Sequence, residues 1–200
     1  MSGLGEYWIP LSGEEVNLVP LAARHELELV EAARERDTYR YTIVPDGPSE
    51  TREYIAGLLD EARAGQCAPY AIEHSGILVG CTRLMSPRWF SSSPVPDVVE
   101  IGGTWLAESV QRSSVNSATK WTLLRYCFEE VGIGRVEFKT DLRNERSRRA
   151  LARLGAHEEG VLRRAHPSLV RGEEGRARDS VMFSLLATEW PLSRESSKVR

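Results

Sequence analysis

Apolar and polar residues follow two different periods along the chain, and these periods divide its first half into strands and helices. Residues 14–22, EEVNLVPLA, alternate with a period of two, which is typical of a half-buried strand. Residues 23–36 and 50–65 repeat their apolar positions every three or four residues, which predicts two amphipathic helices. Ser49 precedes the second helix as its predicted N-cap. Residues 68–85 then predict two strands joined by a Ser-Gly turn.

The second half begins with a strand at residues 98–106, VVEIGGTWL. Gly102 and Gly103 lie inside it, and glycine within a strand often marks a bulge or a close approach of backbone. The pattern then predicts a helix that is ended by Gly132 and Gly134 and carries Trp121, Leu124, Phe128 and Val131 on one face. A strand at 135–141 follows, and then a helix at 144–155 that is capped by Asn144 and ended by Gly155. Two strands at 157–166 and 176–186 close the pattern.

This order of elements indicates an α/β (α+β) fold. The strand–helix–strand unit over residues 98–141 predicts two parallel neighbouring strands with a right-handed crossover. The remaining strands are expected to pair mostly antiparallel, in a mixed sheet with helices on its faces. We place one domain at residues 1–192 and a polar tail at 193–200.

Composition excludes several classes of protein. The net charge of −3 supplies no general positive field for nucleic acid or an anionic membrane. No run of about 18 apolar residues predicts a membrane span, and the start of the chain lacks the pattern of a secretory signal, so we expect a cytoplasmic protein. The cysteines and histidines show no metal-ligand spacing, so no metal is predicted. These residues are Cys67, Cys81, Cys127, His25, His74, His157 and His166.

The loop QRSSVNS, residues 111–117, has two interpretations. It lies where a strand gives way to a helix, and a helix N-terminus offers unpaired amides and partial positive charge to a diphosphate. Small serine and asparagine side chains tolerate tight turns and can bond phosphate oxygens. The same residue types are also ordinary helix caps, with Asn116 or Ser117 as the capping residue.

Together with its surroundings, this loop resembles the GNAT superfamily of acyl-CoA N-acyltransferases. The resemblance rests on EIG in the strand at 98–106, on QRSSVN at the superfamily's Q-x-x-G-x-G/A position, and on the N-x-x-S-x-x-x-L-x-x-L-G pattern of residues 144–155. More narrowly, the chain is similar to the Rim-type branch, named for acetyltransferases of ribosomal-protein N-termini. The resemblance covers almost the whole chain and implies a GNAT fold, with a V-shaped splay between the strands at 98–106 and 135–141.

The resemblance also implies a co-substrate, acetyl-CoA, and an acceptor, the primary amine of a protein N-terminus or of a small molecule such as an antibiotic. Pantetheine would lie in the splay and its pyrophosphate on the loop amides, with Asn144 near the thiol end, while a basic helix that includes Arg149 would attract the 3′-phosphate. Tyr39 and Tyr41 would border the acceptor cleft, and His166, beside a polar loop, is a further candidate there. The implied CoA contacts on the strand and loop are Thr104, Trp105, Leu106, Gln111, Arg112, Ser113, Ser114, Val115, Asn116 and Ser117.

The chain departs from the superfamily pattern in three places. Ser114 and Asn116 replace the glycines that usually allow close approach of phosphate, although asparagine at the second position is familiar in the Rim-type branch. Leu151 replaces the tyrosine that reprotonates the CoA thiolate in many members. Gly103 stands where a large aromatic residue is expected, which would widen the acceptor cleft.

Two residues are candidates for proton transfer. An amine with a pKa of about 10 must lose a proton before it attacks a thioester. Glu100 is the predicted base, and its alternative role is a structural salt bridge. Ser147 is predicted to donate a proton to the thiolate through water, or else only to bond the start of its helix. The reaction would be direct transfer in a ternary complex, because Cys81 and Cys127 lie in apolar segments and Cys67 has no base partner.

Two other functions remain open from the sequence. Loss of the tyrosine and glycines would suit a non-catalytic acyl-CoA-binding sensor or scaffold. The arginines of residues 143–153 would suit a ribosome- or RNA-associated module, although the acidic composition disfavours nucleic acid and a solvated charged face is the ordinary explanation. We therefore predict an acyl-CoA N-acetyltransferase with an amine acceptor and no membrane partner, and a homodimer would be unsurprising for the family.

Overall fold

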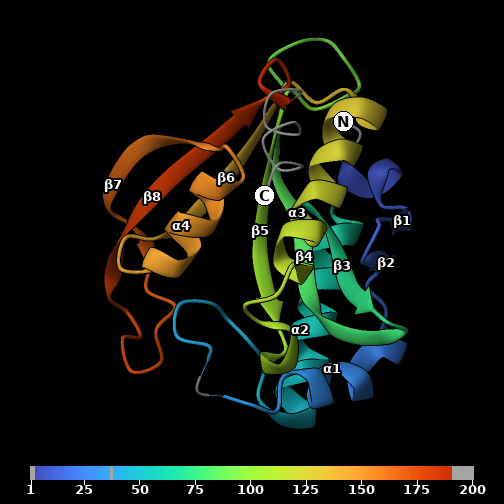
Figure 1. The fold of residues 1–200 in the computed structure, drawn as a ribbon, viewed down its shortest axis with the longest axis vertical. Coiled ribbons are helices and arrows are strands. Elements are labelled where there is room, and N and C mark those ends of the chain that lie inside the picture. Colours follow the sequence, from blue (N-terminus) through green and yellow to red (C-terminus); the bar gives the residue numbers. More distant parts are fainter. Residues whose placement is uncertain (1–2, 37, 191–200) are drawn as a thin grey trace.

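The computed structural model describes residues 3–36 and 38–190, whose strands form one mixed sheet (Figure 1). The strand order is β1-β2-β3-β4-β5-β6-β8-β7. Among the described strands, only β5 and β6 pair in parallel, so the predicted mixed and mostly antiparallel sheet is confirmed. The strands are β1 Leu11–Ser12, β2 Asn17–Pro20, β3 Cys67–His74, β4 Ile77–Arg88, β5 Val98–Leu106, β6 Arg135–Asp141, β7 His157–Pro167 and β8 Ala177–Leu186. The predicted tail at 193–200 lies outside the described residues.

The helices pack on both faces of the sheet. On one face, α1 (Glu26–Ala32) and α2 (Gly47–Arg63) bury Leu29, Ile55 and Leu58 in a cluster with Trp105 of β5. On the other face, α3 (Val115–Arg125) and α4 (Glu145–Arg153) share a second cluster with the apolar side chains of β5, β6 and β8. Short helical turns complete the fold: η1 Leu4–Tyr7, η2 Ala23–His25, η3 Glu108–Val110 and the π-helical η4 Tyr126–Val131.

The predicted helix ends were partly right. Asn144 caps α4 as expected, because its Oδ1 accepts a hydrogen bond of 3.1 Å from the amide of Ser147. The cap predicted at Ser49 is wrong, since α2 begins at Gly47 with Asp46 as N-cap. Pro48 explains the earlier start, because proline fits the first helical turn, where its missing N–H is not needed.

The parallel pair of β5 and β6 separates after three rungs. Val98, Val99 and Glu100 face Arg135, Val136 and Glu137, and beyond them β5 continues along β4 while β6 continues along β8. Figure 1 shows β6, β7, β8 and α4 leaning away from β5 below this junction. The V-shaped splay implied by the sequence is therefore present.

A bulge lies in β5 just past the point of separation. Cys81 pairs with Trp105 and Arg83 with Gly102, so Gly103 and Thr104 together oppose the single residue between them on β4. Gly103 has a φ of +57°, and a Cβ there would lie 2.9 Å from Nε of Arg83. The pair of glycines therefore marked a bulge, because only glycine adopts this backbone without strain or a clash.

Candidate active site

The loop at the end of β5 presents unpaired backbone amides. Ser114 is the N-cap of α3, but its side chain makes no capping bond. Within residues 3–36 and 38–190, no hydrogen bond leads from the amides of Ser114, Asn116 or Ser117. The alternative that Asn116 or Ser117 caps the helix is therefore wrong, because both residues lie inside its first turn. The first turn of α3, which starts at Val115, offers free N–H groups to an anion.

The loop's hydroxyl groups are already engaged with protein. Ser113 Oγ donates to the carbonyl of Val110 at 2.6 Å, and Ser114 Oγ donates to the carboxylate of Glu15. Arg112 is exposed and adopts a positive φ of +63°. An anion at this loop would therefore meet the amides and the charge of Arg112 rather than the serine side chains.

Gln111 connects the two arms of the splay. Its Nε2 donates to the carbonyl of Leu106 at 2.8 Å and to Oγ1 of Thr38 at 2.9 Å. Its Oε1 accepts from Arg146 of α4 at 2.9 Å. The Leu106 carbonyl also accepts from the hydroxyl of Tyr39 at 3.0 Å. Gln111 thus links β5 to α4 through hydrogen bonds, and the Leu106 carbonyl has two protein donors.

The side chains of Trp105 and Thr104 point to opposite faces of β5. Trp105 is 2 % exposed and its Nε1 donates to the hydroxyl of Tyr54 on α2 at 3.3 Å, so its indole lies outside the splay. Thr104 Oγ1 lies 2.8 Å from Oγ1 of Thr82 and accepts a hydrogen bond from Lys120 of α3. The side chain of Thr104 therefore lies on the α3 side of β5, where a buried lysine bonds it.

The burial of Lys120 and its contact with Thr104 were not predicted from the sequence. It is only 6 % exposed, and burial lowers its pKa to about 7, although the nearby charge of Glu100 acts in the opposite direction. The one signal in the sequence is a charged residue between Thr119 and Trp121, on a helix that otherwise packs on the sheet. Only the rotation of α3 against β5 turns this side chain inward.

Glu100 lies at the last paired rung, where the splay begins. It is 7 % exposed, and its Oε2 lies 3.3 Å from Nζ of Lys139 on β6. The ion pair that was its alternative role is thus present, at the same place where a base would be needed. Its role as base stays a prediction.

The face of β6 and β8 on the same side as Glu100 is polar. Lys139 and Asp141 project from it, and Nδ1 of His166 lies 3.0 Å from Oγ of Ser180. Burial lowers the pKa of His166, and the charges of Lys139 and Arg178 lower it further. His166 thus lies within reach of the charges of Lys139, Arg178 and Glu100, and its place at the acceptor site stays a prediction.

The two tyrosines proposed for the acceptor cleft lie in different places. Tyr39 packs edge-to-face on Trp105, with ring centroids 6.2 Å apart, at the end of β5. Tyr41 lies under the guanidinium of Arg143, whose Cζ is 5.6 Å from the ring centroid. Tyr41 is thus beside the end of β6, whereas Tyr39 supports the β5 carbonyl.

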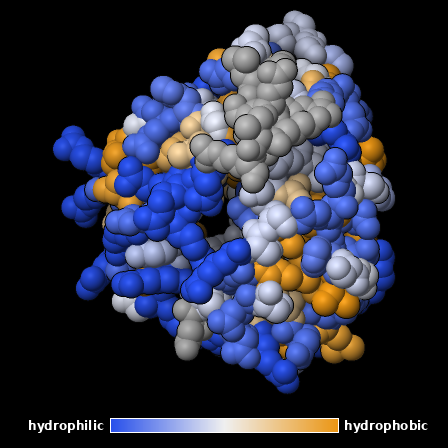
Figure 2. Space-filling model, in the orientation of Figure 1, coloured by the Kyte–Doolittle hydropathy of each residue, from blue (hydrophilic) through white to orange (hydrophobic). Residues whose placement is uncertain are grey.

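The arginines around α4 are largely paired. Arg149 lies 3.2 Å from Glu145 of the same helix, and Arg148 lies 3.3 Å from Glu158. Figure 2 shows hydrophilic side chains over α4 on the face in view. This arrangement favours an ion-paired, solvated face and leaves less free positive charge for the 3′-phosphate or for RNA than the sequence suggested.

Comparison with known proteins identifies the family. The domain described as Acetyltransferase (GNAT) domain matches residues 15–157. YdaF of Bacillus subtilis (strain 168), named as a candidate ribosomal N-acetyltransferase, is 32% identical over 154 residues, which cover 77% of this chain and 72% of that protein. This chain belongs to the GNAT superfamily.

Solved structures agree with this assignment. A candidate acetyltransferase from T. thermophilus superposes with a TM-score of 0.80 and 32% identity, over 96% of each chain. RimJ of Mycobacterium smegmatis, solved in complex with CoA-disulfide, superposes with a TM-score of 0.70 and 25% identity, over 91% of this chain and 88% of that one. The chain is thus an acyl-CoA N-acetyltransferase of the Rim-type branch, as the sequence predicted.

The structure does not favour a cysteine nucleophile or a proton donor at position 151 in this GNAT enzyme. Cys67, Cys81 and Cys127 are buried, and burial raises the pKa of each thiol, to about 12 for Cys67. Buried thiols of this kind are packing residues rather than nucleophiles. Leu151 is part of the apolar core, so no hydroxyl is offered from that position. No helix of the described residues has the length and apolar character that crossing a membrane requires.

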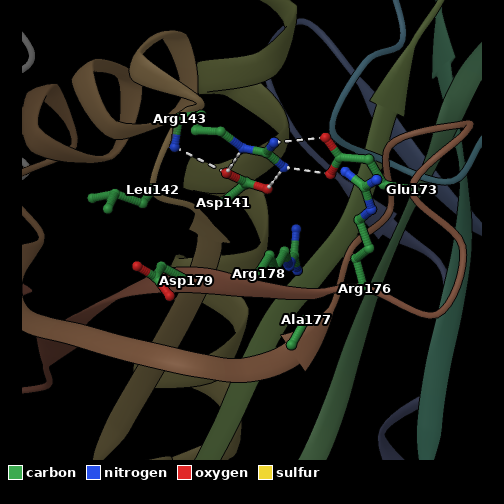
Figure 3. A pocket seen from close by; sticks show the side chains of 8 residues that line it. All are labelled: Asp141, Leu142, Arg143, Glu173, Arg176, Ala177, Arg178 and Asp179. Carbon is green, nitrogen blue, oxygen red and sulfur yellow. Dashed lines mark hydrogen bonds and ion pairs between the residues drawn. The ribbon is translucent and has the colours of Figure 1, made fainter.

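The GNAT enzyme also has a hollow that the sequence did not reveal, of about 340 Å³, at the far end of β6. Its walls come from the end of β6, the loop between β7 and β8, and the start of β8 (Figure 3). The lining residues are Asp141, Leu142, Arg143, Glu173, Arg176, Ala177, Arg178 and Asp179.

Proposed function

We propose that this enzyme transfers the acetyl group of acetyl-CoA to a primary amine, by direct attack while both substrates are bound. The separation of β5 from β6 after Glu100 is the observation that carries this proposal. Two neighbouring parallel strands that part in this way leave backbone groups of β5 without a strand partner. An extended amide-containing chain such as pantetheine can occupy that place.

The residues around the splay fit the parts of acetyl-CoA. The amides of Ser114, Asn116 and Ser117 would hold the pyrophosphate, with Arg112 adding positive charge. Because the Leu106 carbonyl already has donors in Tyr39 and Gln111, the pantetheine would pair with the earlier part of β5, up to Thr104. Asn144 and Ser147, at the start of α4 on the other arm, would lie near the thiol end of the bound acetyl-CoA.

Proton transfer would use Glu100. The carboxylate lies at the base of the splay with Lys139 beside it, so it can accept a proton from an incoming ammonium, directly or through water. Ser147 would order or protonate the leaving thiolate through water, because Leu151 offers no acid. Holding both reactants in line removes a large part of the barrier, about 7–11 kcal/mol in ideal cases.

The acceptor is either a protein N-terminus or a small-molecule amine. The name of YdaF, a candidate ribosomal N-acetyltransferase, favours the N-terminus of a ribosomal protein. The ion pairs along α4 disfavour a function that depends on RNA contact.

A panel of amines with acetyl-CoA tests the proposal. The panel contains peptides with free N-termini, lysine-containing peptides blocked at the N-terminus, and aminoglycosides. We expect release of CoA thiol together with a product heavier by one acetyl group, and a lower rate for Glu100→Gln. Stabilisation of the protein by CoA with no turnover on the whole panel would instead indicate an acyl-CoA sensor.

A further inference from the structure

Two ion pairs of Arg143, with Asp141 and Glu173, lie along one wall of the hollow at the end of β6. Nε and Nη2 of Arg143 bond the two carboxylate oxygens of Asp141 at 3.0 and 2.8 Å. The same guanidinium bonds Glu173 at 2.9 and 3.0 Å, and Ser168 Oγ adds a bond of 2.6 Å. These bonds lower the pKa of Glu173 to about 2. Asp141 and Glu173 therefore stay ionised, and both have a fixed partner in Arg143.

Arg178 lies inside this hollow without a partner. It is 9 % exposed, and its buried Nε makes no hydrogen bond to the described residues. No carboxylate of residues 3–36 or 38–190 lies within 4 Å of its guanidinium, although Figure 3 shows it pointing from β8 toward the pair of Asp141 and Arg143. Burial lowers the pKa of Arg178, but an arginine keeps its charge in proteins. A buried cation with unused donors is costly unless an anion completes the site.

The position of Arg178 connects the hollow with the reaction centre. Asp141 pairs with Ser180 across the sheet, and Lys139 pairs with Met182. Because side chains alternate along a strand, Arg178 projects to the same face as Asp141 and as Lys139, which contacts Glu100. The charges of Asp141 and Glu100 both act on Arg178. The hollow thus lies on the face of the sheet that also carries Lys139 and Glu100.

We propose that Arg178 binds a carboxylate of the acceptor, so that the enzyme selects amines that carry an acidic group close to the nitrogen. This inference rests on the proposed acetyl transfer and names the substrate class. A guanidinium with free donors accepts a carboxylate in a bidentate geometry. A phosphate fits less well, because its second negative charge would face Asp141 and Glu173, whose charges Arg143 already holds in place.

Matched acceptors test this selection. One pair is a peptide amide that begins with Asp and its counterpart that begins with Asn; the other is alanine and alaninamide. We expect the wild-type enzyme to favour the acidic member of at least one pair by about tenfold or more in kcat/KM, mainly through KM. The first pair detects recognition of an acidic side chain, and the second detects recognition of a free α-carboxylate.

Variants assign the preference to this side chain. Arg178→Gln should bring the acidic-to-neutral ratio close to one, whereas Arg176→Gln, at the exposed rim of the same hollow, should leave it unchanged. Calorimetry of the acidic peptide without acetyl-CoA should show weaker binding to Arg178→Gln than to wild type. Equal use of both members of each pair by wild type, which needs no variant, overturns the proposal, as does a preference that survives in Arg178→Gln. If no amine of any kind is acetylated, the proposed function itself has failed.

Discussion

The buried lysine of α3 should make the stability of the protein rise with pH. Lys120 is 6 % exposed, and its ammonium donates to Thr104 of β5. Burial lowers its pKa from 10.5 to about 7, so the folded protein releases this proton near neutral pH. The unfolded chain keeps the proton up to a pH of about 10.4. Between these values the unfolded state binds more protons, and stability therefore increases as pH rises.

The size of the effect follows from the difference between the two pKa values. Each pKa unit corresponds to about 1.4 kcal/mol, so the buried charge of Lys120 costs at most about 5 kcal/mol, with the full cost below pH 7. Integration from pH 7 to pH 10 gives a gain in the free energy of unfolding of about 3–4 kcal/mol from this group alone. Thr104 keeps its contact of 2.8 Å with Thr82 when the lysine is removed, so little should offset this gain.

Urea unfolding of wild type and Lys120→Met at pH 7, 8.5 and 10 measures this contribution. The variant should be more stable at pH 7, by up to about 4 kcal/mol, and its advantage should shrink by about 3–4 kcal/mol at pH 10. Taking the difference at each pH cancels the titration of all other groups, and Lys120→Leu gives an independent repeat. A difference that stays constant within about 0.5 kcal/mol, or that grows with pH, would refute the reasoning.

Three further outcomes are expected. Asn144→Ala should lose about 1 kcal/mol of stability, because it removes the cap of α4, and it should also lower kcat/KM. Asn144→Asp keeps the cap and serves as the control. Unchanged CoA affinity and turnover in Asn144→Ala would exclude a role of Asn144 in the site. Glu100→Gln should slow turnover most at low pH, where the acceptor amine is hardest to deprotonate, and a full rate across the pH range would remove Glu100 as the base. Gly103→Val should lower the midpoint of thermal unfolding through a strain of about 1–3 kcal/mol at its positive φ and a clash with Arg83, and an unchanged midpoint would contradict the bulge.

The sequence by itself determined the elements and the family. Within the described residues, the hydrophobic periods predicted the four α-helices and every strand except the short β1 in their observed order, because the periods of 2 and 3.6 depend only on residues close together in the chain. The cap at Asn144 and the bulge at Gly103 were also local, since each depends on the backbone within a few residues. The motifs of the GNAT superfamily lie in such local segments, which is why the fold and the enzyme class could be predicted.

Only the tertiary structure decided how side chains from separate elements meet. Lys120 is buried because the packing of α3 turns its side chain toward β5. Gln111 links β5 to α4 because Arg146 of α4 donates a hydrogen bond to it. Arg178 became an unpaired cation because Arg143 already occupies the nearby carboxylates. Burial and ion pairing depend on the packing of segments that are far apart in sequence. The hydrophobic pattern of one segment does not indicate which charged side chains the segments packed against it will bring close.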